Sequence, residues 1–208
     1  MLTASRDIRL LLTGFQGWGD IKINPSELIG QQLDGAVLQL KGQPDSTDAP
    51  ASSISATNSA LPLEVSPSST RAILTFKPVR VSYREIEKLV PQFHDSGEWD
   101  CIVHVGLAKG YEACTIETGS KSLGYSLKDV DGELAPEVGL SRGVEGTKSR
   151  WDCTMDCREC CDELNGMGYK VPEPKEDDPT APYTLSELTE IVRALCNFTA
   201  RQAVAVKA

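Results

Sequence analysis

The sequence has few histidines, few aromatic residues and no long apolar run, and each shortage narrows what the protein can be. Its 208 residues include two histidines, and 6% of them are aromatic. No apolar run approaches the roughly 20 residues that a membrane helix requires. Residues 1–9 also lack the apolar stretch and the small-residue cleavage site of a secretory signal. We therefore expect a cytoplasmic protein that does not associate with membranes.

Basic residues are in the minority. Lysine and arginine number 21 against 30 aspartates and glutamates, which gives a formal net charge of -9. Because binding to phosphate backbones needs a basic face, we expect no nucleic-acid partner. The remaining composition, 40% hydrophobic and 25% charged, is ordinary for a globular protein. We expect a single domain over residues 1–208, a length that allows a substantial buried core.

The seven cysteines are expected to be thiols, because disulfides are rare in the cytosol. Four of them fall within nine residues, at Cys153, Cys157, Cys160 and Cys161. Four thiolates suit zinc, but a single helix that carries all four cannot wrap a tetrahedron around an ion. We therefore favour a partly buried helix over a metal site, and we expect no metal and no cofactor.

Short apolar runs and amphipathic segments alternate along the chain. The runs predict strands at residues 8–13, 36–40, 72–76 and 100–107. The amphipathic segments predict helices at residues 27–33, 82–90, 155–164 and 184–198. Capping boxes at residues 82–85 and 184–187 mark the starts of two of these helices. This alternation predicts an α/β fold with a mostly parallel sheet that is covered on both faces.

One long segment has a different composition. Residues 42–71 are rich in serine, threonine, proline, alanine and aspartate. Such a segment cannot bury enough apolar area to offset the entropy that is lost when it is ordered. We interpret it as a disordered polar insertion within the domain.

Four further motifs follow one another in the first two thirds of the chain. Residues 12–19 read Leu-Thr-Gly-Phe-Gln-Gly-Trp-Gly and are followed by Asn24-Pro25-Ser26. Residues 78–83 read Pro-Val-Arg-Val-Ser-Tyr, and residues 104–117 run from His-Val-Gly to Thr-Ile-Glu. Residues 124–132 begin with Gly-Tyr and end with Lys-Asp-Val-Asp-Gly. The glycines of the first motif are not spaced like a dinucleotide-binding fingerprint.

This ordered set of motifs resembles the pyroglutamyl-peptidase I family, and it is closest to the fungal and other eukaryotic members. The resemblance covers about residues 8–133, apart from the polar insertion. It implies a three-layer α/β/α sandwich and the activity of a cysteine-type exopeptidase, which removes N-terminal pyroglutamate from peptides. The family's chemistry uses a cysteine nucleophile, a histidine base and an acidic residue that orients the histidine, because a thiol is mostly protonated at neutral pH.

Three residues match functional positions of the family. Glu117 stands where the family has its acidic residue, in a loop that follows the strand predicted at residues 100–107, and α/β sheets gather their sites at that edge. Phe15 and Trp18 stand where aromatic rings sandwich the lactam ring of pyroglutamate. A flat aromatic surface suits a small planar ring. The alternative for both aromatic residues is that they simply cover the edge of the sheet.

The nucleophile has two candidate alignments. Residues 193–199 resemble the family's nucleophile segment and make Cys196 its counterpart, although the local pattern is one long helix. The rival alignment places residues 177–179 on the strand end before the nucleophile. It leaves Thr184 at the nucleophile's position, with no cysteine there. In that case Cys196 is a core residue on the apolar face of a helix.

No histidine stands where the resemblance requires a base. The family's base follows the cysteine on a late strand, whereas His94 and His104 precede every candidate nucleophile. We expect His104 to be structural and His94 to be solvated. Residues 203–206 imitate only the start of the late strand, so the sandwich is expected to be incomplete at its C-terminus. Two alternatives remain: an exopeptidase acting on pyroglutamyl peptides, or an inactive or truncated relative that acts as a binding protein.

Overall fold

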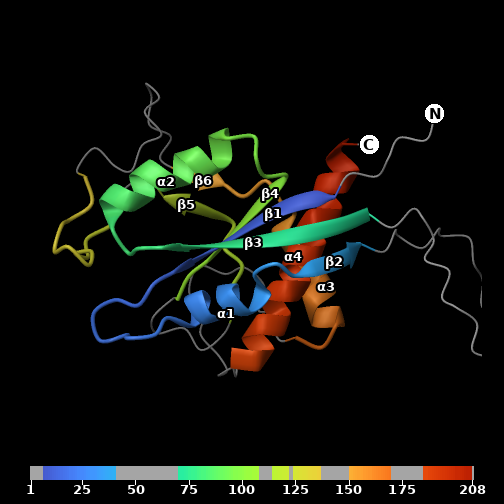
Figure 1. Ribbon diagram of the computed structural model, residues 1–208, viewed down its shortest axis with the longest axis horizontal. Coiled ribbons are helices and arrows are strands. Elements are labelled where there is room, and N and C mark those ends of the chain that lie inside the picture. Colours follow the sequence, from blue (N-terminus) through green and yellow to red (C-terminus); the bar gives the residue numbers. More distant parts are fainter. Residues whose placement is uncertain are drawn as a thin grey trace, which may run out of the picture.

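The computed structural model describes residues 7–40, 70–107, 114–121, 124–136, 150–169 and 185–207. In these residues four strands form one sheet, in the order β2-β3-β1-β4, and two short strands form a separate pair (Figure 1). The four strands of the sheet are β1 (Ile8–Phe15), β2 (Val37–Leu40), β3 (Thr70–Val79) and β4 (Cys101–Val105). The separate pair consists of β5 (Gly119–Lys121) and β6 (Arg150–Asp152), which run antiparallel.

The sheet is mixed but mostly parallel, as the sequence predicts. β1 lies at its centre and pairs in parallel with β3 on one side and β4 on the other. β2 is an edge strand that runs antiparallel to β3. The register sets Phe15 opposite Val79 and Gly14 opposite Val105, so the carboxyl ends of the three parallel strands meet at one edge.

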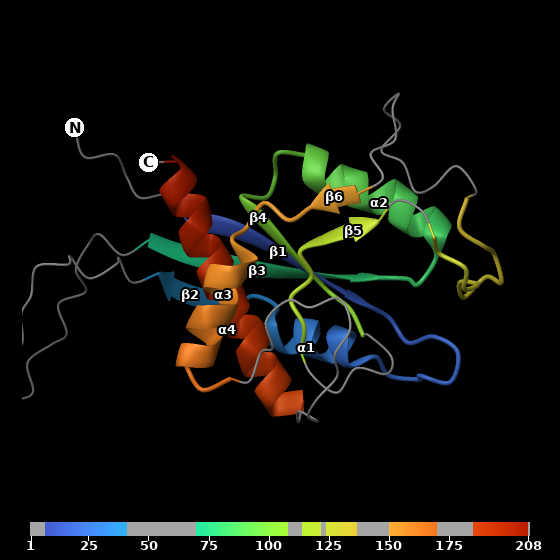
Figure 2. The same cartoon turned by 180° about the vertical axis from the view of Figure 1, so that it is seen from behind.

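Helices cover both faces of the sheet (Figures 1 and 2). They are α1 (Pro25–Leu33), α2 (Tyr83–Asp95), α3 (Cys157–Gly166) and α4 (Leu185–Lys207). α1 and α4 lie against one face and α2 against the other, while α3 packs on the outer side of α4. The predicted α/β sandwich is therefore present.

The alternating side chains of β1 supply both faces of the core. Leu10 and Leu12 pack with residues of α1 and α4, and Leu11 packs with residues of α2. All three leucines are at most 1% exposed. Burying a leucine side chain of this kind contributes about 2 kcal/mol. β1 thus lies between the two halves of the core and contributes to both.

Two predicted boundaries differ from the structure. β3 begins at Thr70 and runs without interruption through Pro78, whereas the polar insertion was predicted to extend to residue 71. Arg71 takes part in the ladder with β2, and its guanidinium forms an ion pair with Asp7 at 2.7 Å. Partners far away in the sequence therefore order these two residues. Apart from Thr70 and Arg71, the predicted insertion lies outside the described residues.

The predicted capping box at the start of α2 is wrong. The side chain of Ser82 makes no capping hydrogen bond with the helix. Instead Oδ2 of Asp129 accepts a hydrogen bond from the backbone N–H of Tyr83, at 3.0 Å. The cap comes from a residue 46 positions further along the chain, which a local sequence pattern does not reveal. Residues 203–206, which imitate the start of a strand, are helical and belong to α4.

Gly30 provides a test of how closely α1 approaches the sheet. A Cβ atom at this position would lie 2.0 Å from the ring of Phe76 on β3. Gly30→Ala is therefore expected to lower the free energy of unfolding by about 1–3 kcal/mol through overpacking, although alanine favours helices. Urea denaturation measures the change.

The matched control is Gly166→Ala at the end of α3, where nothing lies within 4 Å of the new Cβ. This variant should be no less stable than the parent. Combining Gly30→Ala with Phe76→Leu should recover part of the loss, because the smaller side chain can move away from the new methyl group. An equal loss in both glycine variants would contradict the predicted clash.

Candidate functional site

The carboxyl edge of the parallel strands is where the fold can assemble a site. The chain leaves β1 for α1 on one face of the sheet and leaves β3 for α2 on the opposite face. Around β1 the connections therefore diverge, and ligands of open α/β sheets bind in the crevice at such a point. The loops after β1 and β3 border this edge.

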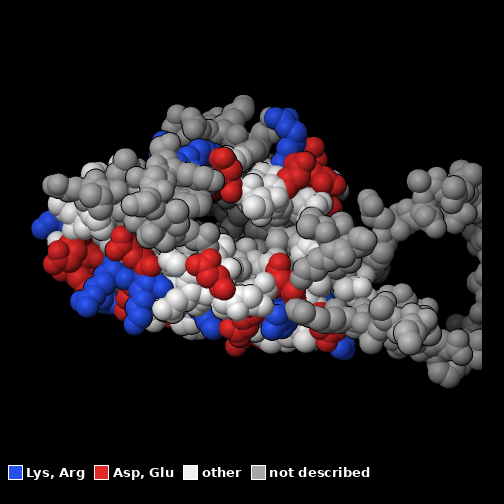
Figure 3. All heavy atoms as spheres, turned by 90° about the horizontal axis from the view of Figure 1, so that it is seen from above, with Lys and Arg blue, Asp and Glu red and all other residues white. Residues whose placement is uncertain are grey.

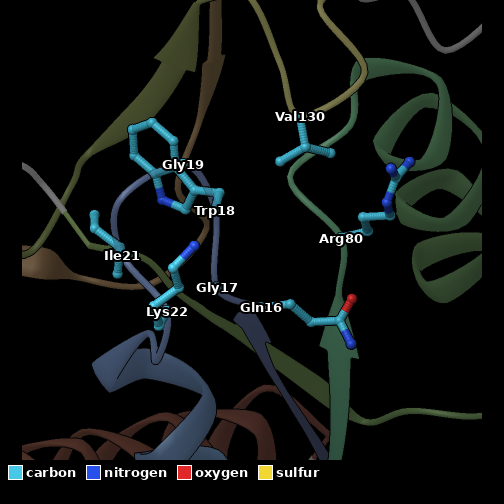
Figure 4. A pocket seen from close by; sticks show the side chains of 8 residues that line it. All are labelled: Gln16, Gly17, Trp18, Gly19, Ile21, Lys22, Arg80 and Val130. Atoms are coloured by element: carbon cyan, nitrogen blue, oxygen red, sulfur yellow. The ribbon is translucent and has the colours of Figure 1, made fainter.

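A pocket of about 320 Å³ lies at this edge (Figure 4). Most of its lining comes from the loop after β1, and the rest comes from two residues on the opposite side. In Figure 4, Trp18 lies on one side of the opening and Val130 on the other, and the amine of Lys22 extends toward the opening on the side of Trp18. The complete lining consists of Gln16, Gly17, Trp18, Gly19, Ile21, Lys22, Arg80 and Val130. The pocket therefore combines one aromatic surface with amide and ammonium donors.

The Asn-Pro-Ser motif holds the loop of this pocket in place. Asn24 is fully buried and caps α1, because its Oδ1 accepts hydrogen bonds from the backbone N–H and the hydroxyl of Ser26, at 3.0 and 2.8 Å. Its amide donates to the carbonyl of Gln16 at 3.3 Å. The hydroxyl of Ser26 accepts from the N–H of Phe15 at 3.0 Å. These bonds join both ends of the loop to the first turn of α1.

Two glycines allow this loop to pack closely. A Cβ at Gly14 would lie 2.4 Å from the carbonyl oxygen of Ser26, and one at Gly17 would lie 2.4 Å from that of Lys22. Both contacts are with backbone, which cannot move aside as a side chain can. These two glycines of the motif therefore serve the close packing of the loop.

The opposite wall is held by a network of carboxylates. Arg80 makes two hydrogen bonds with Asp131, at 2.5 and 2.6 Å. The guanidinium lowers the pKa of the Asp131 carboxyl. Asp129 accepts from the N–H of Tyr83, and the N–H of Val130 donates to the carbonyl of Val81 at 3.1 Å. These contacts hold Val130 over the pocket and keep the Arg80 side chain paired with Asp131.

The structure separates the two aromatic residues that the resemblance pairs. Trp18 is half-buried and lines the pocket. Phe15 is also half-buried, but it packs with the cluster between the sheet and α2 and does not line the pocket. Its ring lies 3.7 Å from the place of a Cβ at Gly106. Trp18 is therefore available to a ligand in the pocket, whereas Phe15 covers the sheet.

Glu117 is exposed in the loop that precedes β5, beyond the lining of the pocket. After burial, the nearby charge of Glu117 is the next cause that raises the pKa of Tyr125. Its backbone carbonyl accepts a long contact from the thiol of Cys157, at 3.9 Å. Glu117 therefore lies close to Tyr125 and to the start of α3.

The structure places Cys196 in the core. It lies within α4, is 0% exposed, and packs against the face of the sheet opposite α2. Burial, followed by the neighbouring Cys101, raises the pKa of its thiol far above the ordinary value. A thiol in this place is neither ionised nor accessible at neutral pH. The rival alignment, with residues 177–179 and Thr184, lies outside the described residues.

The two histidines pair with each other on the α2 face of the sheet. Nε2 of His94 lies 3.2 Å from Nε2 of His104, and Nδ1 of His104 lies 2.7 Å from the hydroxyl of Thr13. Both histidines are separated from Cys196 by the sheet itself. Neither therefore contacts the candidate nucleophile. His94 is exposed, as expected, and it also lies against His104.

The cysteine cluster forms part of the packing between α3 and α4. Cys157, Cys160 and Cys161 are buried there, with the half-buried Cys114 against them. Burial raises the pKa of Cys160 to about 12 and that of Cys114 to about 11. Within the parts of the chain that the structure describes, no group of three or more histidine, cysteine or acidic side chains is arranged to hold a metal ion.

Sequence reasoning missed several residues of the pocket. Gln16 and Lys22 flank the aromatic position of the glycine loop, and Arg80 and Val130 belong to motifs to which the sequence assigns no role. The usable signal was that the motifs with Gln16 and Arg80 follow β1 and β3, whose ends meet at one edge. Only the folded chain shows which of their side chains reach the pocket.

The architecture defines an α/β sandwich of one particular type, the fold of pyroglutamyl peptidase I. The structure of pyroglutamyl peptidase I from Bacillus amyloliquefaciens superposes with a TM-score of 0.67, covering 95% of this chain and 98% of that chain at 14% identity. A variant of pyrrolidone carboxyl peptidase from the hyperthermophile Pyrococcus furiosus gives 0.67, with 94% and 100% coverage at 14% identity. No family model and no curated protein matches the sequence.

Surface properties add little that is specific to a site. On the face shown in Figure 3, acidic and basic side chains are interspersed, and the basic groups form no extended patch. None of the described helices is sufficiently long and apolar to cross a bilayer.

Asn24→Ala tests whether the Asn-Pro-Ser motif holds the loop of the pocket in place. The change removes a helix cap and leaves buried hydrogen-bonding groups without partners, so it is expected to lower the free energy of unfolding by about 2 kcal/mol. Urea denaturation measures this loss. Gln31→Ala, an exposed change on the same helix, should alter stability by less than about 0.5 kcal/mol. Similar effects of both changes would show that Asn24 holds nothing essential.

The histidine pair predicts a pH dependence. Partial burial and the like charge of His94 lower the pKa of His104 below its ordinary 6.5. Since the folded state disfavours the protonated ring, this contribution to stability is present above about pH 6.5 and is lost as the pH falls through the lowered pKa. An NMR titration of the imidazole signals should show His104 titrating below 6.5. In His94→Gln its midpoint should rise, and an unchanged midpoint would contradict the coupling.

Proposed function

We propose that this chain recognises peptides with an N-terminal pyroglutamate, in the pocket at the carboxyl edge of its sheet. The observation that supports this most strongly is a full-length match to the fold of pyroglutamyl peptidase I, combined with a pocket at the edge where that fold collects loops. We also propose that the protein is cytosolic and needs no cofactor.

The lining of the pocket suits such a ligand. The lactam ring of pyroglutamate is small and flat, and the ring of Trp18 offers a flat apolar surface to it. The amide of Gln16 and the ammonium of Lys22 can donate hydrogen bonds to the lactam carbonyl or to the peptide carbonyl that follows. A free α-amino group would meet the positive charge of Lys22, so an uncapped N-terminus is disfavoured.

Hydrolysis is the part of the family's activity that this chain supports less well. The cysteine mechanism needs a thiolate, a base beside it and an acidic residue that orients the base. Cys196 is buried within α4, both histidines lie across the sheet, and the interactions of Glu117 are with Cys157 and Tyr125. We therefore propose that recognition has been kept and that acyl transfer through Cys196 has not. The alternative is a cysteine exopeptidase in which Cys196 and Glu117 act together.

Binding tests the recognition directly. Isothermal titration with a short pyroglutamyl peptide should give binding that the same peptide with N-terminal proline does not show. Trp18→Ala should weaken the affinity by about tenfold or more, which corresponds to about 1.4 kcal/mol. The matched control is Leu127→Ala, because this side chain is 74% exposed and does not line the pocket. Equal affinity for both peptides, or an unchanged affinity in Trp18→Ala, would overturn the proposal.

The same preparations separate recognition from hydrolysis. A fluorogenic pyroglutamyl amide should be bound but not cleaved, by the parent and by Cys196→Ala alike. Cleavage by the parent that disappears in Cys196→Ala would establish the exopeptidase and refute the loss of acyl transfer. Cleavage that persists in Cys196→Ala would refute the exopeptidase that acts through Cys196, and it would contradict the expected absence of hydrolysis by showing that another residue is the nucleophile.

A further inference from the structure

Two cysteines at the start of α3 lie together but differ in their access to solvent. Cys153 is exposed, in the segment between β6 and α3. Cys157 is the first residue of α3 and is 8% exposed. Both residues contact the same short segment, because the N–H of Cys153 donates to the carbonyl of Thr118 and the thiol of Cys157 contacts the carbonyl of Glu117. After burial, Cys153 is the next cause that raises the pKa of the Cys157 thiol. An accessible thiol therefore has a second, shielded thiol nearby.

The backbone on both sides of this pair is held in place. The N–H of Cys153 donates to the carbonyl of Thr118 at 2.8 Å, next to the paired strands β5 and β6. Asp156 caps α3 by accepting from the N–H of Glu159 at 2.9 Å. The thiol of Cys157 contacts the carbonyls of Met155 and Glu117, at 3.6 and 3.9 Å. The pair is thus anchored to two separate elements.

We propose that Cys153 and Cys157 form an oxidisable dithiol site, which a hydroperoxide converts into an intramolecular disulfide. The thiolate of Cys153 attacks one oxygen of the hydroperoxide, the O–O bond breaks, and the leaving alkoxide takes up a proton. The product is a sulfenic acid on Cys153. The thiol of Cys157 then loses its proton and attacks the sulfenic sulfur, so that an S–S bond forms and water leaves. In sum, two thiols and one hydroperoxide give a disulfide, an alcohol and water.

The order of the two steps follows from accessibility and charge. Cys153 meets the oxidant first because its side chain is exposed, whereas Cys157 is shielded. Burial and the neighbouring Cys153 raise the pKa of Cys157 to about 12, so Cys157 is a poor first nucleophile. Cys160 and Cys161 are at most 1% exposed and are not expected to compete.

Oxidation would also change the contacts that Cys153 and Cys157 make with the loop that carries Glu117. As a disulfide, Cys157 no longer carries the proton that it can donate to the carbonyl of Met155 or Glu117, and Cys153 is tied to α3 as well as to Thr118. The disulfide therefore constrains the turn between β6 and α3, which contacts Glu117 and Thr118. Reduction by a dithiol restores the original contacts.

The sequence makes the modification easy to locate. Trypsin cleaves after Arg150 and Arg158, so Cys153 and Cys157 fall together on the peptide of residues 151–158. Cys160 and Cys161 fall on the following peptide, and Cys114 falls on another. The full-length, reduced chain is treated with hydrogen peroxide, blocked with N-ethylmaleimide, reduced, labelled with iodoacetamide and digested. Mass spectrometry then reports which thiols were oxidised reversibly.

The expected result is that the peptide of residues 151–158 carries two carbamidomethyl groups, in proportion to the peroxide added. Without peroxide, N-ethylmaleimide should label Cys153 at least about tenfold faster than Cys157. In Cys153→Ser, Cys157 should be blocked by N-ethylmaleimide and carry no carbamidomethyl group, because it is oxidised only through Cys153. Cys157→Ser should leave Cys153 to proceed to the sulfinic acid. Cys101→Ser, in β4, is the matched control and should behave like the parent.

Three results would overturn the proposal. They are a peptide of residues 151–158 without the double label in the parent, a disulfide that joins Cys153 to a different cysteine, or a carbamidomethyl group on Cys157 in Cys153→Ser. Because Cys153 is exposed, Cys153→Ser is expected to fold. Circular dichroism of each variant confirms that a lost label reflects the missing thiol and not unfolding.

Discussion

The burial of strand β1 on both of its faces is the constraint on which the rest of this structure depends. Leu10 and Leu12 are held by α1 and α4, and Leu11 is held by α2. Because β1 also pairs in parallel with strands on both sides, its carboxyl end is fixed against theirs. The loop that follows β1 therefore starts from a rigid point, and a rigid start is what a binding loop requires.

The pocket is built outward from that point by polar contacts. On one side, the buried Asn24 and Ser26 tie the glycine loop to α1. On the other side, Asp129 and Asp131 tie their segment to the start of α2 and to Arg80. Each wall thus depends on side chains that satisfy backbone groups at the start of a helix. The same physical need, capping a helix, positions both walls.

The residues that the resemblance would join into one catalytic group are kept apart by the sheet. Cys196 faces the core below the sheet, and the imidazoles of His94 and His104 lie above it. A thiol surrounded by apolar side chains stays protonated, because its charged form loses hydration and gains no partner. The exposed Cys153, by contrast, has a neighbouring thiol and contact with solvent. The reactivity of a cysteine here follows from its surroundings and not from its motif.

The sequence by itself determined the alternation of strands and helices, the parallel sheet and the edge at which a site forms. These features depend on local periodicity, which apolar residues such as those of residues 8–13 display directly. Tertiary structure alone decided that Asp129 caps α2, that Trp18 lines the pocket while Phe15 does not, and that Cys196 is buried. Each of these outcomes depends on contacts between segments far apart in the chain. Such contacts form only when the whole core packs, so no local pattern records them.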